Sequence, residues 1–394
     1  MKKLMILGAG VSQVPLIRKA KEMGLCTIVV SRQGNYPGFA WADCIRVVDT
    51  TDTERVTAVA AEEKIDGICT TGTDVAVRTL GLTADRLGLA GVSAKAAALC
   101  CDKALMKEAF RNFGICSADS IQASTLKESA EAFRALSPPV LFKAVDNGAS
   151  KGIVRVDDPS QIEEAFAKVM KATKRDYLIV EKFIAGIEFG AQAFVLNRKL
   201  QFVMPHGDLM FYGDAGVPIG HYVPIALPER VLRETEETLL ACAEALQLDR
   251  CAINADFILQ DGRVFVLEIG ARAGATCLPE LVSIYYGMDY YEYMIRIALG
   301  ESPAFTPLQA QPCACELLFS HVGGRIVRME NGNEPGPEII DISFDVQVGD
   351  IVSPFRVGTD RIGQIIVKGN SLEETMLALE KHKKAIRIET APIA

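Results

Sequence analysis

The chain has 394 residues, 49% of them apolar, and a formal charge of −8. This length predicts two or three domains of about 150 residues, each able to bury its own core, and excludes a mainly disordered chain. Acidic and basic residues are spread without runs of one sign, which argues against a main role in binding nucleic acid or an anionic membrane.

Three further features concern the compartment. Uncharged stretches such as residues 4–17 are shorter than the ~20 residues of a membrane-spanning helix, so no such helix is expected. The apolar N-terminal run is interrupted by Gly8 and then by Arg18, so we interpret it as folded protein and not as a signal peptide. Eleven scattered cysteines without a C-x-x-C pair favour reduced thiols in a cytoplasm and disfavour a metal cluster.

The first hundred residues alternate short β-branched runs with helical patterns. Helices are predicted to end near Met23 and Glu63, and the strands have the sequences LMILGAG, CTIVVSR, CIRVVD and IDGICTTGTD. This alternation predicts a parallel sheet with helices on both faces.

The turn after the first strand carries part of a dinucleotide-binding fingerprint. Gly8 and Gly10 match its first two glycines, but Gln13 stands at the third position. The second strand ends at Ser31 and Arg32, where an acidic residue would bind a ribose hydroxyl. NAD(P) binding is therefore disfavoured, and the turn is interpreted as a helix start or as a site for a substrate anion.

The central part of the chain becomes strand-rich after a helical region. Residues 93–136 have mostly helical patterns, which Pro138-Pro139 ends. A compact unit follows, with the strands PPVLFKAV, GIVRV and YLIVEKFI and a helix from Pro159 to Thr173. Next come the strands AQAFVLN and LQFVMPHG, a long glycine-rich loop through Tyr222, a helix over residues 229–246, and the hairpin CAINADFIL/VFVLEIG.

The composition shifts beyond Gly300. The sequence TPLQAQPCAC is typical of a linker, and the remainder has several glycine-centred turns and one helix after Ser371. This pattern predicts a small antiparallel C-terminal unit.

A glycine-rich turn over residues 147–152 joins two predicted strands, and Lys143 precedes it by four residues. Backbone N–H groups of such a turn can surround phosphate oxygens, while the lysine supplies a positive charge. The alternative is an ordinary hairpin without a ligand.

Asp256 and Glu268 give a stronger signal, because each lies on the polar face of a strand whose other face is apolar. A two-residue turn at Asp261-Gly262 would place the two carboxylates on opposite faces. An odd loop ending at Arg263 would set them opposite each other on one face, at the distance where they need a cation such as Mg²⁺ or Mn²⁺. The alternative is a surface hairpin with two solvated acids.

Taken in chain order, the α/β opening, Lys143 with the glycine-rich turn, and the hairpin with Asp256 and Glu268 resemble the motifs of the ATP-grasp superfamily of ATP-dependent carboxylate ligases. The opening half is similar to phosphoribosylglycinamide synthetases and bacterial L-amino acid ligases, and the end of the chain is similar to the last domain of biotin carboxylases. The resemblance implies an α/β chain of three domains. These are a Rossmann-like pre-ATP-grasp domain at residues 1–98, an ATP-grasp domain at 99–300 with a mobile lid at about 138–186, and a small α+β C-terminal domain at 301–394.

The resemblance also implies cofactors and site residues. It implies ATP together with Mg²⁺ or Mn²⁺, Asp256 and Glu268 as metal ligands, and Arg272 and Lys143 as catalytic residues. The implied nucleotide-binding residues are Lys103, Lys143, Gly148, Ser150, Lys151, Gly152, Glu181, Lys182, Phe183, Ile184 and Glu188.

Individual roles follow from the same resemblance. Glu181 is implied to accept from the adenine amino group, and Glu188 to bind the ribose. The implied substrate residues are His206, His221, Arg272 and Gly274. A lone histidine in a loop is more often structural, so that alternative stays open for both histidines.

One position departs from the family pattern. The second metal strand usually continues E-x-N-x-R, whereas Gly270 occupies the middle position here. Glycine has no side-chain oxygen, so the number of metal ions stays open, and Asn254 on the same predicted face is a candidate replacement.

The implied reaction joins a small carboxylic acid, such as an amino acid, to an amine through an acyl phosphate, with release of ADP and phosphate. The expected partners are these small molecules and a second copy of the chain, without nucleic acid or membrane. Two alternatives stay open at this point. One is a purine-pathway phosphoribosylamine ligase or a carboxylase-like enzyme, and the other is a non-catalytic ATP-sensing protein.

Overall fold

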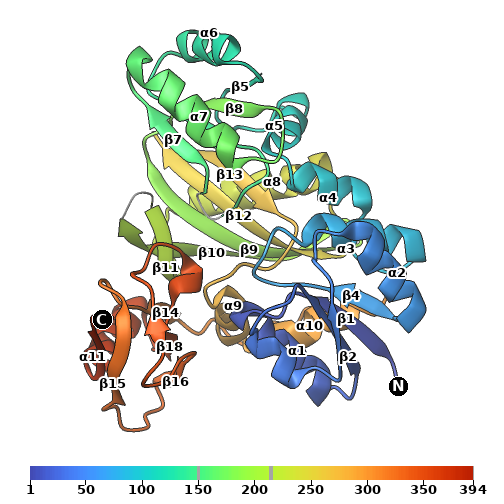
Figure 1. Cartoon of the computed structure of the whole chain (residues 1–394), viewed down its shortest axis with the longest axis vertical. Coiled ribbons are helices and arrows are strands. Elements are labelled where there is room, and N and C mark those ends of the chain that lie inside the picture. The colour runs from blue at the N-terminus through green and yellow to red at the C-terminus, as the bar shows by residue number, and fades with distance from the viewer. Residues whose placement is uncertain (149–150, 213–215, 394) are drawn as a thin grey trace. The chain divides into compact units, whose positions relative to one another are not determined.

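The structure is a computed structural model that describes residues 1–148, 151–212 and 216–393. The chain forms two compact units, each built from segments far apart in the sequence (Figure 1). The first contains Met1–Val203, Leu227–Ala273 and Tyr291–Phe305, and the second contains Met204–Ala226, Gly274–Tyr290 and Thr306–Ala394. The division into three domains stays a prediction.

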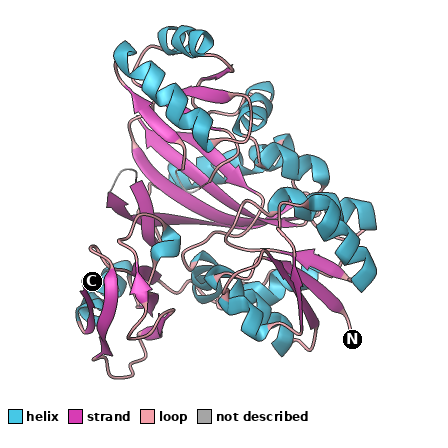
Figure 2. Ribbon diagram, in the orientation of Figure 1, coloured by secondary structure: helices cyan, strands magenta, loops and turns pink. Residues whose placement is uncertain are grey.

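The first unit begins with the parallel sheet that the alternating pattern predicts. Its strand order is β3-β2-β1-β4, and β1 and β2 are buried apolar runs, as in a sheet covered on both faces. Figure 2 shows the helices and strands of the whole chain in the same orientation. Asp74 lies in the loop between β4 and α3. The elements are β1 (Lys3–Leu7), α1 (Val14–Glu22), β2 (Cys26–Ser31), β3 (Cys44–Val47), α2 (Thr53–Glu63), β4 (Gly67–Cys69) and α3 (Val77–Leu87).

Gln13 fills the turn after β1. Its side chain accepts a hydrogen bond from Gly10 N at 2.9 Å and donates one to the Thr71 carbonyl oxygen at 2.5 Å. Gly8 has a φ of 101°, and a Cβ there would lie 2.9 Å from the Gln13 side chain. The side chain therefore occupies space in which a dinucleotide fingerprint brings its backbone to a pyrophosphate.

We expect NADH and NADPH not to compete with ATP for this protein, because Gln13 blocks the turn after β1 and β2 ends at Ser31. The measurement is displacement of a fluorescent ATP analogue by either dinucleotide at millimolar concentration, with unlabelled ATP as the control. Displacement comparable to that by ATP would contradict this interpretation of the turn.

A second sheet of the first unit has the order β5-β8-β6-β7 and packs against α6 and α7. The prediction is confirmed for β6, β7, β8 and α7, but β5 is a strand within the stretch that the pattern predicts as helical. β5 is four residues long with two exposed side chains, so its sequence has no clear period. The elements are β5 (Ser120–Ala123), α6 (Leu126–Leu136), β6 (Val140–Ala144), β7 (Ile153–Val156), α7 (Ile162–Ala172) and β8 (Leu178–Lys182).

The remaining strands of the first unit are antiparallel, with β12 between β9 and β13. Helix α8 packs on β13, and α5 packs on α4 and on α8. The elements are α4 (Ala94–Cys100), α5 (Lys103–Asn112), β9 (Ile187–Leu196), α8 (Glu229–Ala245), β12 (Cys251–Gln260), β13 (Arg263–Gly270) and α10 (Tyr290–Ala298).

The turn between β12 and β13 differs from the prediction. Gln260 pairs with Arg263, so the turn has two residues, Asp261 and Gly262, with φ of 49° and 75°. Positive φ at both positions is typical of a type I′ turn, which Asp-Gly favours. The predicted odd loop is therefore wrong.

A β-bulge supplies the odd residue instead. Phe257 still follows the register of the turn, whereas Asp256 pairs with Glu268, so Leu267 is the extra residue on β13. The two carboxylates therefore face each other as predicted, by a different route.

The second unit continues β10 from the first. Within it, β10 pairs with β11, and the strands after β11 are β14, β18 and β16, all antiparallel, while a smaller sheet has the order β17-β15-β19. The antiparallel C-terminal unit and its helix after Ser371 are confirmed. The elements are β10 (Lys199–Tyr212), β11 (Gly216–Val223), α9 (Leu278–Tyr286), β14 (Cys313–Leu318), β15 (Gly324–Asn331), β16 (Ile339–Phe344), β17 (Ile351–Val352), β18 (Gly363–Lys368), α11 (Leu372–Lys384) and β19 (Ile386–Ala391).

The pairing of β10 with β11 corrects the prediction of a long glycine-rich loop through Tyr222. Gly207 lies opposite Tyr222, and a Cβ at Gly207 would lie 2.0 Å from an atom of the tyrosine ring. A Cβ at Gly220 would lie 2.2 Å from the carbonyl oxygen of Cys315 on β14. These glycines are strand residues with close neighbours, and such positions are easily mistaken for turns in a sequence.

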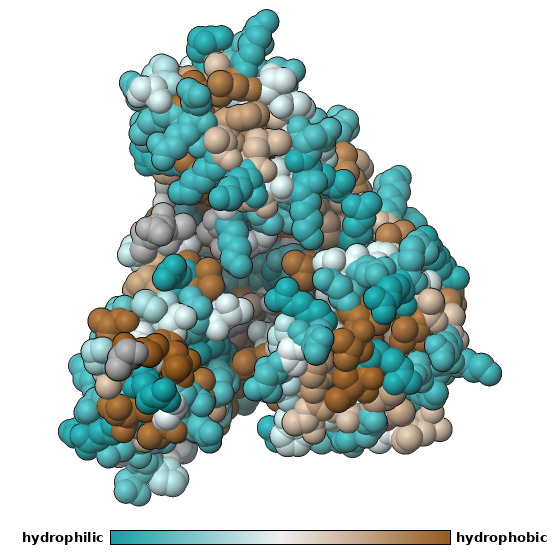
Figure 3. Space-filling model, viewed as in Figure 1, coloured by the Kyte–Doolittle hydropathy of each residue, from teal (hydrophilic) through white to brown (hydrophobic). Residues whose placement is uncertain are grey.

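Among the described residues, no helix is long and apolar enough to cross a bilayer. On the face in Figure 3, hydrophilic side chains cover much of the region of α6 and α7, with apolar residues between them. Single exposed apolar side chains, such as Leu126 at the start of α6, are ordinary on a protein surface.

Candidate active site

Two buried lysines lie one turn apart on α5. Asp102 caps this helix by accepting hydrogen bonds from backbone N–H groups of the first turn, at 3.0 and 3.3 Å. Lys103 and Lys107 are four residues apart, so their side chains leave the helix on the same face. Lys103 contacts Glu268, and Lys107 contacts Glu181.

Lys103 connects the glycine-rich loop to β13. Its Nζ lies 2.7 Å from Glu268 Oε1 and 2.6 Å from the carbonyl oxygen of Asn147. Burial lowers the pKa of Lys103, but the carboxylates of Glu268 and Asp74 outweigh this effect and raise the pKa above its ordinary value. The ammonium group is therefore charged at neutral pH.

Asp256 and Glu268 lie on the same face of the β12–β13 hairpin, because they pair directly across it. Asp256 is exposed, and 30% of the Glu268 side chain is accessible to solvent. Two facing carboxylates repel each other unless a cation lies between them, and carboxylate oxygens are preferred ligands of Mg²⁺ and Mn²⁺. This donor set therefore fits a hard divalent cation.

Arg272 follows β13 and forms a bidentate ion pair with Asp74. The Nε lies 2.7 Å from Oδ1, and the second terminal nitrogen lies 2.6 Å from Oδ2. Burial raises the pKa of Asp74, but Arg272 and then Lys103 outweigh it and hold the pKa below its ordinary value. Burial lowers the pKa of Arg272, while Asp74, Asp256 and Glu268 raise it, so both partners stay charged.

Gly270, the departure from the family pattern, lies opposite Asn254. A Cβ at Gly270 would lie 3.1 Å from Asp74 Oδ1, and a Cβ at Gly148 would lie 2.7 Å from Asp74 Oδ2. The Asp74 carboxylate therefore lies close to the position that a side chain at residue 270 would occupy. Asn254 accepts a hydrogen bond from the Gln192 amide at 2.7 Å, which fixes its orientation.

We expect Asp74→Asn to lower the free energy of unfolding at pH 7 by about 1–2 kcal/mol, because it removes one charge of a partly buried bidentate pair. The pKa of Asp74 is depressed in the folded state, so its stabilisation is present above the unfolded value of ~3.9 and is lost as the pH falls through the folded value. Urea unfolding at several pH values measures the difference from the wild type.

The control for this experiment is Asp176→Asn, which changes an exposed carboxylate of the same unit. The difference between the wild type and Asp74→Asn should be constant from about pH 5 to 8 and shrink below about pH 4. A difference that grows as the pH falls would contradict the ion pair.

Glu181 is buried between two lysines. It forms ion pairs with Lys143 of β6 and with Lys107, whose Nζ lies 3.2 Å from Oε2. Burial raises the pKa of Glu181, but the two ammonium groups outweigh it and hold the pKa below its ordinary value. Glu188, implied to bind ribose, lies exposed on β9.

The resemblance implies an adenine-binding hinge in the residues after Glu181, and the backbone contacts of these residues are known. The N–H of Lys182 donates to the Asp119 carbonyl oxygen at 2.8 Å, and that of Phe183 donates to the Pro139 carbonyl oxygen at 3.1 Å. In the part of the chain that the structure describes, the N–H of Ile184 has no hydrogen-bond partner. This donor is therefore available to a ring nitrogen.

The glycine-rich loop joins β6 to β7, as predicted. The N–H of Ala144 donates to the Gly152 carbonyl oxygen at 2.8 Å, and that of Lys151 donates to the Gly148 carbonyl oxygen at 3.3 Å. Lys151 is exposed. Ser150 lies outside the described residues.

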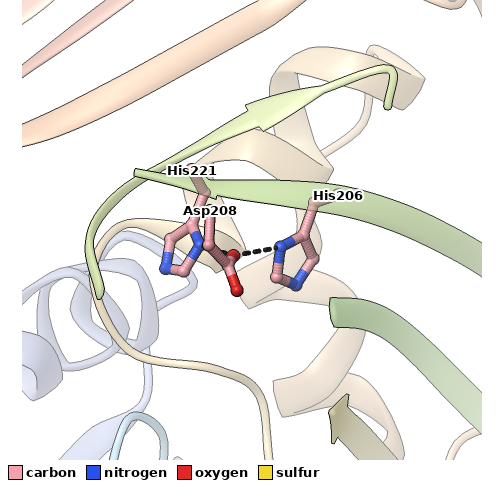
Figure 4. Close-up of side chains that lie close together, drawn as sticks. All are labelled: His206, Asp208 and His221. Atoms are coloured by element: carbon pink, nitrogen blue, oxygen red, sulfur yellow. Dashed lines mark hydrogen bonds and ion pairs between the residues drawn. The ribbon is translucent and has the colours of Figure 1, made fainter. Parts of the chain in front are cut away.

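The other predicted substrate residues lie in the second unit. His206 and His221 each place Nδ1 against Asp208 Oδ1, at 3.0 and 2.6 Å (Figure 4). Burial raises the pKa of Asp208, but the two histidines outweigh it and hold the pKa far below its ordinary value, while burial lowers the pKa of His221. Both histidines are strand residues, as the strand LQFVMPHG predicted for His206, while His221 on β11 corrects its predicted place in the glycine-rich loop. Gly274 is buried.

Sequence reasoning missed Lys107 and Asp74 as site residues. The spacing of four residues between Lys103 and Lys107 is a signal that was available, because it places both side chains on one helix face. Asp74 gives no local signal, since its partner Arg272 is 198 residues away in the sequence.

The first unit thus combines a hairpin loop suited to phosphate, a carboxylate buried between lysines, and two facing acids near Arg272. These are the kinds of groups that a site for a nucleotide and a divalent cation requires.

Comparisons with known proteins agree with this class. An ATP-grasp domain model matches residues 136–280, and an L-amino acid ligase C-terminal domain 2 model matches residues 316–391. The structure of phosphoribosylglycinamide synthetase from Anaerococcus prevotii is 34% identical, with a TM-score of 0.86 over 99% of this chain and 100% of that chain. The chain belongs to the ATP-grasp family.

Two curated relatives are more distant. Alanine–anticapsin ligase of Bacillus subtilis is 24% identical over 331 residues, which are 75% of this chain and 68% of that protein. D-alanine–D-alanine ligase of Paracidovorax citrulli is 28% identical over 224 residues, 54% of this chain, and the match spans 66% of that ligase, slightly less than two thirds of its length.

Proposed function

We propose that this protein is an ATP- and Mg²⁺-dependent ligase that joins a small carboxylic acid, an amino acid, to an amine with release of ADP and phosphate. The observation that carries the proposal is the facing pair Asp256 and Glu268 beside Arg272 and Lys103 in one compact unit. The two carboxylates and the two cationic side chains thus lie in one part of the site.

The nucleotide would lie between Lys143, which pairs with Glu181, and Lys103, which pairs with Glu268. In this proposal the Ile184 N–H and the Glu181 carboxylate would bind the edge of the adenine ring, and Lys143 offers an ammonium group next to Glu181. Lys103 stands between Glu268 and the loop of residues 147–152, where phosphate oxygens would replace the Asn147 carbonyl as its partner.

The chemistry follows from charge. A substrate carboxylate and the γ-phosphate of ATP are both anions, so cationic groups must neutralise them before they meet. The carboxylate oxygen attacks the γ-phosphorus, and the bond to the β-phosphate oxygen breaks to release ADP. The amine nitrogen then attacks the acyl carbon of the acyl phosphate, phosphate leaves, and the nitrogen gives up a proton.

Asp256 and Glu268 would hold Mg²⁺, which when bound supplies positive charge at the phosphate oxygens. Arg272 binds the transferred phosphoryl oxygens in this scheme, and its ion pair with Asp74 orients the guanidinium group. In this scheme water must be kept away from the acyl phosphate, because water would hydrolyse it.

The test is ADP release with Mg²⁺ and a panel of amino acids offered in pairs as acid and amine, with mass spectrometry of the products. ADP release should require both substrates, and the product mass should equal their sum less one water. Binding of ATP without ADP release from any pair would support the ATP-sensing alternative instead.

A second candidate is a phosphoribosylamine ligase, because the 34% identical structure over the full length is a phosphoribosylglycinamide synthetase. Glycine with phosphoribosylamine is therefore one arm of the same assay, and bicarbonate as the acid is the arm for a carboxylase-like enzyme. Activity confined to either arm would replace the amino acid proposal.

Two further proposals concern the compartment and the oligomeric state of the protein. All eleven cysteines are free thiols, which supports a reducing cytoplasm as its compartment. A homodimer is proposed from the family resemblance alone, and light scattering after size-exclusion chromatography measures it directly.

A further inference from the structure

Three side chains able to bind a metal meet on one face of the β10–β11 hairpin in the second unit. His206 and Asp208 are two residues apart on β10, so their side chains leave the strand on the same face. His221 pairs directly with Asp208 across the hairpin and therefore shares that face.

The side chains converge closely. One potential ligand atom from each lies within 4.8 Å of those of the other two, and Asp208 Oδ1 lies 3.0 Å from His206 Nδ1 and 2.6 Å from His221 Nδ1 (Figure 4). The two imidazole rings stand nearly edge to face, with centroids 4.9 Å apart. The carboxylate thus lies between two rings that both turn a nitrogen toward it.

Burial makes this cluster unusual for a surface hairpin. His206 is 2% exposed, His221 is 4% exposed, and 17% of the Asp208 side chain is accessible. The buried His206 Nε2 has no hydrogen-bond partner among the described residues, so no second hydrogen bond holds that ring in its present orientation. A small adjustment of the ring therefore breaks no other hydrogen bond.

We propose that His206, Asp208 and His221 form a binding site for a divalent transition-metal ion of the zinc class. Two imidazole nitrogens and one carboxylate oxygen are borderline ligands that suit Zn²⁺ or Co²⁺, whereas Mg²⁺ prefers a set of oxygens. The site is therefore chemically distinct from the facing pair Asp256 and Glu268. It does not rest on the proposed ligase function.

The geometry needs only a small expansion. In a tetrahedral zinc site with bonds of ~2.0–2.1 Å, the ligand atoms are about 3.3 Å apart. The two nitrogen–oxygen distances at Asp208 are 3.0 and 2.6 Å, so each ring would move outward by less than about 1 Å. Three protein ligands leave the fourth position of such an ion to water or to a small molecule.

The experiment uses the full chain, stripped of metal and dialysed against Zn²⁺ in a buffer with millimolar Mg²⁺. Millimolar Mg²⁺ competes with zinc for carboxylate sites such as Asp256 and Glu268, and the variants below separate the proposed site from other side chains that bind zinc. We expect one equivalent of zinc per chain. Co²⁺ in place of Zn²⁺ should give the visible absorption bands of a four-coordinate site. Added Zn²⁺ should remove these bands. The cobalt measurement tests the proposal on the wild-type chain alone.

Asp208→Asn keeps the shape of the side chain and removes its charge, and His221→Ala removes one ligand. Each should weaken zinc binding by about 100-fold or more, since changes of second-layer groups alone cost 10–100-fold. His321→Ala is the matched control, because His321 is an exposed histidine of the same unit. It should bind zinc like the wild type.

Two results would overturn the proposal. One is the absence of a retained equivalent and of cobalt bands in the wild-type chain. The other is an equivalent that survives both Asp208→Asn and His221→Ala, or that His321→Ala removes. Glu268→Gln, which should strongly lower ADP release, is expected to leave zinc binding unchanged, so failure of this proposal and failure of the ligase proposal are distinguishable.

Discussion

Glu268→Gln is expected to lower Mg²⁺-dependent ADP release about 10²–10³-fold, and Asp256→Asn is expected to have a smaller effect in the same direction. Both residues face the same position across the β12–β13 hairpin, so they would share one ion. Once either charge is removed, the second removal should add little, because residues that act on one ion are not additive. The measurement is kcat as a function of Mg²⁺ concentration for both single variants and the double variant.

Asp261→Asn is the matched control for these variants. It changes an exposed carboxylate in the turn of the same hairpin, where asparagine tolerates the positive φ. It should keep wild-type turnover. Independent effects that add up in the double variant would instead indicate two solvated acids on a surface hairpin, and the metal pair would be abandoned.

Lys143→Met is expected to lower kcat by about 10²–10³-fold. The substitution removes a positive charge that would stabilise the negative charge on the phosphate oxygens in the transition state of phosphoryl transfer. The loss of stability should be smaller in comparison, about 1–3 kcal/mol, since Lys107 still lies 3.2 Å from Glu181 and leaves that buried carboxylate one partner. Single-turnover ADP formation and urea unfolding, measured on the same preparation, separate the two effects.

Lys199→Met, at an exposed position at the start of β10, serves as the control for loss of a lysine. Lys143→Arg should recover part of the turnover, because it restores the charge in a different shape. Wild-type turnover of Lys143→Met together with normal stability would show that the phosphate groups bind elsewhere.

The parallel sheet and the strands around the lysines could be predicted from the sequence because their signals are local. Apolar runs such as β1 and the strand that ends at Lys182 reflect burial of a short segment, whatever its partners are. The same holds for α11, whose start at Ser371 is marked by a capping side chain that accepts from the Glu374 N–H.

The site itself depends on contacts that no local pattern encodes. Asp74 approaches Gly270 and Arg272 only because β4 and β13 belong to one compact unit. Gly207 and Gly220 resemble turn residues in the sequence, yet each is a strand position that a neighbouring group covers. A glycine signals that space is short or that φ is positive, and the sequence alone does not say which.

The bulge at Leu267 separates two properties of the hairpin that are usually linked. In a regular hairpin, the number of residues in the turn decides which side chains share a face, so one inserted residue inverts the whole strand. In this hairpin the extra residue Leu267 shifts the pairing by one residue between the turn and the acidic pair, so that the two carboxylates share a face despite the two-residue turn. A homologue with three turn residues and no bulge would present Asp256 and Glu268 in the same alignment, and a change in turn length among relatives is therefore no evidence that the cation pair has been lost.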